Sequence, residues 1–106
     1  MFIAYEVSLE VIRLLRPVLP LIARHDPDLA DQLRRASNAA PLHIAEGRRL
    51  GGREPRQYYR RASGTSGEGM AALDVAIAAG YVDEPVVAAA RATIDRLLGL
   101  LYPLAR

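Results

Sequence analysis

Residues 83–105 read DEPVVAAARATIDRLLGLLYPLA, and this stretch decides the fold class. Its apolar residues recur at alternating steps of three and four, which is the spacing of a buried stripe on a helix in a left-handed bundle. The stripe consists of Val87, Ala90, Ile94, Leu97, Leu101 and Leu104. Asp83 stands where an N-cap residue is expected. The sequence therefore predicts a long amphipathic helix that begins after Asp83.

A first helical segment is predicted over about residues 3–24. Val7, Val11, Leu14, Val18 and Ile22 recur at helical steps. Pro17 and Pro20 each remove a backbone donor, so we expect a kink or an early end there. Further apolar residues widen the buried stripe beyond what a monomeric bundle needs, namely Leu9, Ile12, Leu15 and Leu19.

A second helical segment opens at HDPDLADQL, residues 25–33. Asp26 is placed to cap it, and Pro27 occupies the first helical position, where a missing N–H costs little. Pro41 is expected to interrupt this helix, and Gly47 is its expected end. The predicted buried stripe is Leu29, Leu33, Ala36, Ala40 and Ile44.

A third helix is predicted from Glu54 or Pro55 to Gly80, with one side formed by Tyr59, Ala62, Ser66, Leu73 and Ile77. Gly64, Gly67 and Ala71 follow one another at steps of three and four. They form a smooth strip that another backbone could approach closely. Each helical glycine costs about 1 kcal/mol relative to alanine, so packing has to repay that loss.

Short connections between four helical segments indicate an all-α fold, an antiparallel up-down-up-down four-helix bundle that spans residues 1–106 as one domain.

The chain has no cysteine, which removes disulfides and thiolate metal sites. No apolar run reaches the ~18 residues that a membrane span needs. The N-terminal stretch has no basic region typical of a signal peptide, so we expect a cytoplasmic protein without a membrane partner.

Positive charge is concentrated in one part of the sequence. Residues 34–61 contain eight arginines against Glu46 and Glu54, a local net charge of +6 in a chain of net charge +2. A stripe of guanidinium groups beside tyrosines suits phosphates and stacked bases. The candidate nucleic-acid-binding residues are Arg48, Arg49, Arg53, Arg56, Tyr58, Tyr59, Arg60 and Arg61. A solvated surface with scattered ion pairs, or an interface between subunits, would use the same arginines.

Catalysis is not indicated by this residue pattern. His43 and Glu46 are three residues apart and can share a helix face, but a di-metal bundle needs such a pair from two helices plus further carboxylates. His25 has no matching partner, and no histidine lies near Ser37, Ser63 or Ser66 in the sequence. We therefore predict a protein that is not an enzyme and has no metal or cofactor.

Two glutamates fit structural roles better than chemical ones. Glu46 lies among arginines in the sequence, so a buried or interfacial ion pair is expected. Glu68 can pair with Arg61 or with an arginine of the preceding helix. Together with Gly64, Gly67 and Ala71, these two glutamates are the predicted structural or interface residues.

Six short motifs follow one another over residues 33–81: Arg35-Ala36, Pro41, Ile44-Ala45-Glu46-Gly47, Tyr58-Tyr59-Arg60, Gly64-Thr65 with Glu68, and Gly80-Tyr81. By their order and spacing the segment resembles a family of small bacterial four-helix-bundle proteins, the ribosomal RNA intervening-sequence proteins, which includes accessory proteins of diversity-generating retroelements. The family usually has asparagine where this chain has His43, and an aromatic residue where it has Pro55.

The resemblance implies a ring of five bundles, and its retroelement branch implies nucleic-acid binding in partnership with a reverse transcriptase. Two hypotheses follow. One is an oligomeric, non-catalytic protein that binds RNA or DNA through backbone electrostatics, without sequence specificity. The other is an oligomeric scaffold for a protein partner, in which the arginines stabilise interfaces.

Overall fold

The computed structural model describes residues 2–50 and 54–106. Within these ranges every regular element is a helix, which confirms the predicted all-α class. The helices are α1 (Ile3–Leu15), α2 (Leu19–Ala23), α3 (Pro27–Leu50), α4 (Arg56–Ala78) and α5 (Glu84–Ala105).

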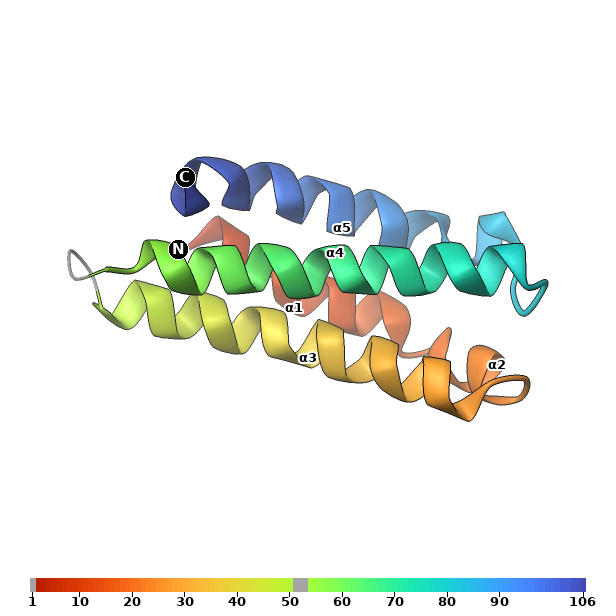
Figure 1. The fold of residues 1–106 in the computed structure, drawn as a ribbon. Helices are drawn as coiled ribbons and strands as arrows, with labels where there is room; N and C mark the ends of the chain where they lie inside the picture. Colours follow the sequence, from red (N-terminus) through yellow and green to blue (C-terminus); the bar gives the residue numbers. More distant parts are fainter. Residues whose placement is uncertain (1, 51–53) are drawn as a thin grey trace.

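The four long helices lie side by side along the 44 Å axis of the molecule (Figure 1). Both α1 and α4 pack against α3 and α5, so the four helices surround a shared apolar core. Each successive long helix runs opposite to the one before it (Figure 1). As a result, the start of α1, the end of α3, the start of α4 and the end of α5 all lie at one end of the molecule.

The predicted first helix is divided into α1 and α2, as its prolines indicated. Pro17 lies between the two helices, and the Val18 N–H donates to the Leu15 carbonyl at 2.9 Å in the connecting turn. Pro20 lies in the first turn of α2, where its missing N–H costs little. Val18 and Ile22 are both buried, so the apolar stripe continues across the break.

Helix α3 begins as predicted but extends further than predicted. The Leu29 N–H donates to Asp26 Oδ1 at 3.0 Å, which confirms the cap. Pro41 does not interrupt α3, and Gly47 does not end it; both predictions are wrong. Pro41 removes only one backbone hydrogen bond, and buried residues on both sides of it, Ala40 and Ile44, hold the helix in the core.

The connection between α4 and α5 uses the left-handed conformation of Gly80, whose φ is 79°. The Tyr81 N–H donates to the Ala76 carbonyl at 2.9 Å and the Gly80 N–H to the Ile77 carbonyl at 3.0 Å, which is a Schellman motif. Asp83 occupies the N-cap position of α5 in an extended conformation. Its side chain makes no cap hydrogen bond, so that part of the prediction is wrong.

The core consists of apolar side chains from every helix, with leucine and isoleucine at its centre. Ser8, Ser37 and Ser66 are the buried polar residues among those described. None of the described helices is long and apolar enough to cross a membrane.

Candidate nucleic-acid interface

Six described arginines lie at the end of the molecule where α3 finishes and α4 begins (Figure 1). We call this region the arginine end, and it comprises Arg48, Arg49, Arg56, Arg60, Arg61 and Arg106. The first two lie in the last turn of α3, the next three in the first two turns of α4, and the last follows α5. Arg53, which the sequence analysis placed in the same group, lies outside the described residues.

Three of these guanidinium groups lie over aromatic rings. Arg61 lies 4.8 Å from the ring centre of Tyr58, and Arg48 lies 5.3 Å from that of Phe2. Arg106 lies 5.7 Å from the ring centre of Tyr102. Cation–π contacts at exposed sites contribute about 0.5–1 kcal/mol each. They orient the guanidinium groups while leaving their N–H donors available.

Tyr59 has a different role from the one that the sequence suggested. Its side chain is 7% exposed, and its ring meets Phe2 edge to face with a centroid distance of 6.1 Å. Burial raises the pKa of the Tyr59 hydroxyl, an effect that the nearby charge of Arg48 opposes. A ring in this position is covered by its neighbours and is not open to stacking on a base, so Tyr59 serves as a packing residue between α4 and the N-terminus.

Two of the predicted arginines make contacts within the chain. Arg60 Nε donates to the carbonyl of Ala105 at 2.6 Å and so links the start of α4 to the end of α5. Arg49 forms an ion pair with Glu46 one turn earlier on α3. The hydrogen bond from Arg49 lowers the pKa of the Glu46 carboxyl, and the arginine charge acts in the same direction. The ion pair between Arg49 and Glu46 lies on the surface, so it is not the buried ion pair that was one of the two roles expected for Glu46.

The remaining arginines keep their charge available. Among the residues that the structure describes, Arg48, Arg56 and Arg61 take part in no ion pair. Arg48 also borders a surface hollow between α1 and α3, together with Tyr5, Ala45 and Arg49.

Gly47 explains the close approach of α3 and α4 at this end. A Cβ atom at Gly47 would lie 3.0 Å from Tyr59 Cε1 and 3.3 Å from the Cβ of Tyr58. Ile44, three residues earlier, is fully buried. The motif Ile44-Ala45-Glu46-Gly47 therefore packs α3 against α4 and positions the tyrosines.

Three contributors to the arginine end were missed in the sequence analysis: Phe2, Tyr102 and Arg106. Tyr102 and Arg106 are four residues apart, and this spacing places two side chains on one helix face. That signal was available in the sequence. Nothing local linked Phe2 to Arg48, because these residues are brought together by the packing of α1 on α3.

The predicted interface strip lies on the outer side of α4. Gly64 and Ala71 are exposed and Gly67 is half-buried. Apart from the chain neighbours and the local helix backbone, no atom lies within 4 Å of a Cβ built at either glycine. Val75, one turn beyond Ala71, is 51% exposed and extends the strip. Glu68 lines a groove between α3 and α4 and forms no ion pair with any described residue.

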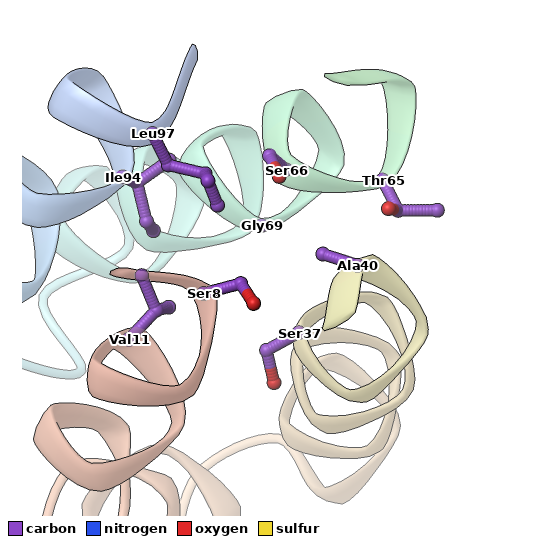
Figure 2. A pocket seen from close by; sticks show the side chains of 9 residues that line it. All are labelled: Ser8, Val11, Ser37, Ala40, Thr65, Ser66, Gly69, Ile94 and Leu97. Carbon is purple, nitrogen blue, oxygen red and sulfur yellow. The ribbon is translucent and has the colours of Figure 1, made fainter. Parts of the chain in front are cut away.

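A small cavity lies at the centre of the molecule, where Ser8, Ser37 and Ser66 approach one another from three helices (Figure 2). Each hydroxyl donates to a carbonyl of its own helix: Ser8 to Tyr5 at 2.6 Å, Ser37 to Arg34 at 3.0 Å and Ser66 to Ala62 at 2.7 Å. The volume is about 10 Å³, near the minimum for one water molecule. An organic substrate does not fit there, and no histidine lines the cavity.

His43 lies half-buried on α3. Burial lowers the pKa of its imidazole, and the positive charge of Arg61 lowers it further. Within residues 2–50 and 54–106, no three histidine, aspartate or glutamate side chains are grouped so that they could hold a metal ion.

The fold and the arginine end define a small all-α protein with a basic, aromatic-rich end. The chain belongs to the family of 23S rRNA-intervening sequence proteins, whose model matches residues 3–103. This confirms the resemblance found in the sequence.

A crystal structure from Bacteroides thetaiotaomicron, described as a protein of unknown function from the S23 ribosomal protein family, is similar to this chain with a TM-score of 0.84. The two chains share 15% sequence identity over 97% of this chain and 98% of the other. The likeness therefore shows the fold alone. No curated protein sequence matches the chain.

Proposed function

We propose that this protein is a non-catalytic four-helix bundle that assembles into a ring and binds nucleic acid through the arginine end, without sequence specificity. The observation that carries the proposal is the set of arginines at one end of the molecule, of which Arg48, Arg56 and Arg61 pair with no described carboxylate. Arginine is suited to phosphate recognition because its planar group presents several N–H donors in a fixed fork.

The described helices do not include a recognition element that would read base edges in a groove. Binding through phosphate contacts positions a protein on nucleic acid but carries no sequence information. The name of the family, 23S rRNA-intervening sequence protein, supports a nucleic-acid ligand. We propose that this binding takes place in the cytoplasm.

A ring would repeat the arginine end once per subunit. Several weak contacts on one polyanion then act together, because each later contact is intramolecular. A ring of five, as the family resemblance implies, turns a modest charge cluster into a strong binding surface.

The test is the salt dependence of binding, measured by fluorescence anisotropy with RNA and DNA of mixed sequence. We expect tight binding in dilute buffer and a decrease of about 0.9 log units in affinity per log unit of salt for each duplex phosphate contact. Replacing Arg48, Arg56 and Arg61 with alanine should weaken binding and flatten this slope. Arg60 stays in place because it holds the end of α5.

A matched control replaces Arg16, Arg24 and Arg96 with alanine. These arginines are exposed, form no ion pair among the described residues and lie away from the arginine end. The control loses the same charge, so binding that weakens equally in both variants would contradict a localised site. Absence of binding in dilute buffer would overturn the proposal.

A second candidate function is a scaffold for a protein partner such as a reverse transcriptase. The contacts of Arg60 with Ala105 and of Arg49 with Glu46 favour it, because they use arginines within the protein. If the Arg48, Arg56 and Arg61 variant dissociates into monomers, these arginines belong to an interface and the scaffold function is preferred.

A further inference from the structure

We propose that the nucleic acid bound at the arginine end is single-stranded, and that Tyr102 and Tyr58 stack on its bases. This inference rests on the proposed function and specifies its ligand.

Tyr102 is the most exposed tyrosine or phenylalanine of the chain, with 66% of its surface accessible to solvent. It lies in the last turns of α5, one residue before Pro103. Exposing a large aromatic ring to water is unfavourable, and most aromatic side chains of folded proteins are largely buried. Arg106 lies over the ring but leaves most of the side chain open, so a further planar group has room to contact it.

Tyr58 supplies a second aromatic ring at the same end. Its side chain is half-buried, and Arg61 lies 4.8 Å from the ring centre. The hydrogen bond from Arg60 Nε to the Ala105 carbonyl joins the helix of Tyr58 to the helix of Tyr102. The two arginine–tyrosine pairs therefore lie on neighbouring helices that are tied together.

Tyrosines paired with arginines fit a single strand better than a duplex. In a duplex the faces of the bases are covered by their neighbours, whereas a single strand offers both its phosphates and its base faces. Aromatic stacking tolerates every base because each has a π-face. Removing one stacking ring typically lowers affinity about 5- to 150-fold. Stacking of tyrosines on base faces therefore agrees with binding that does not depend on the base sequence.

The first experiment uses tryptophan fluorescence. The chain contains no tryptophan, so Tyr102→Trp provides a single reporter. We expect a mixed-sequence single-stranded oligonucleotide to quench this fluorescence and a duplex of the same length to leave it nearly unchanged. Val86→Trp is the control, because Val86 is 48% exposed at the opposite end of α5, and its fluorescence should not respond to either ligand. Equal quenching of both reporters would contradict stacking at the arginine end.

The second experiment measures affinity by anisotropy. Tyr102→Leu keeps an apolar side chain but removes the aromatic face, and we expect single-strand affinity to fall about fivefold or more with duplex affinity unchanged. Val86→Ala should bind as the wild type does. Single strands of RNA and of DNA are tested separately; a response to either supports the proposal, and the comparison identifies the sugar that the site accepts.

The outcomes separate this inference from the proposed function. If duplex and single strand bind equally with a steep salt slope, and Tyr102→Leu changes neither affinity, the inference is overturned while the proposed function stands. If neither ligand binds in dilute buffer, both are overturned.

Discussion

At the scale of single residues, His43 makes the stability of the fold depend on pH in the acid range. Burial and the charge of Arg61 lower the pKa of this imidazole, so the folded protein favours the neutral form more than the unfolded chain does. Between the lowered pKa and the ordinary value near 6.5, the unfolded state binds more protons. The contribution of His43 to stability is therefore present above about pH 6.5 and is lost as the pH falls through the lowered pKa.

We predict that His43→Asn reduces the loss of stability on acidification. Denaturant unfolding at fixed protein concentration, at about pH 7.5 and about pH 5 on either side of the ordinary histidine pKa, measures the difference. Asn38→Ala, at an exposed position of α3, changes no titratable group; it is the control and should keep the acid response of the wild type. A full acid response in His43→Asn would show that other groups cause it.

At the scale of elements, the close contact between α3 and α4 depends on the glycine at position 47. Gly47→Ala gains about 1 kcal/mol of helix propensity, but its new Cβ meets the buried ring of Tyr59, and overpacking typically costs 1–3 kcal/mol. We predict a net loss of roughly 1 kcal/mol in the free energy of unfolding, because Phe2 and the core hold the ring in place.

Gly99→Ala is the matched control for this prediction. Gly99 is exposed on α5, away from the strip on α4, and no atom beyond its chain neighbours and the local helix backbone lies within 4 Å of a Cβ at this position, so the substitution should stabilise α5 by up to about 1 kcal/mol. Chemical denaturation of both variants checks the opposite signs. Equal stabilisation by both would mean that Tyr59 moves away from Gly47 without cost.

At the scale of the whole molecule, the outer surface predicts an oligomer. Leu42 is 70% exposed on α3, and the strip of Gly64, Gly67, Ala71 and Val75 is open on α4. A contiguous apolar strip such as the one on α4 marks an interface in soluble proteins. Light scattering should give a mass several times that of the chain, five times if the ring implied by the family forms.

The strip itself is tested by Ala71→Glu, which places a charge in its middle and should reduce the mass to that of a monomer. Ala92→Glu, at an exposed position of α5, should leave the oligomer intact. A wild-type monomer at micromolar concentration would refute the assembly, whereas a dimer or tetramer would refute only the number five.

Much of the fold followed from the sequence because the deciding interactions are local. Apolar residues three and four apart define a helix face within two turns, and Asp26, Pro27 and Gly80 act on the helix ends next to them. The family resemblance could be recognised for the same reason, since its motifs depend on order and spacing. The concentration of arginine in residues 34–61 was likewise visible without a structure.

The tertiary structure decided which residues share the arginine end. Arg60 and Ala105 are 45 residues apart in the sequence, and Phe2 reaches Arg48 and Tyr59 only through the packing of α1. The sequence pattern placed Tyr59, and not its neighbour Tyr58, on the helix side of Ala62 and Ser66, but it was the packing of α4 that turned this side toward the core and buried Tyr59. Local rules act within a turn or two of helix, whereas these contacts depend on how whole helices pack, and packing also keeps α3 continuous through Pro41.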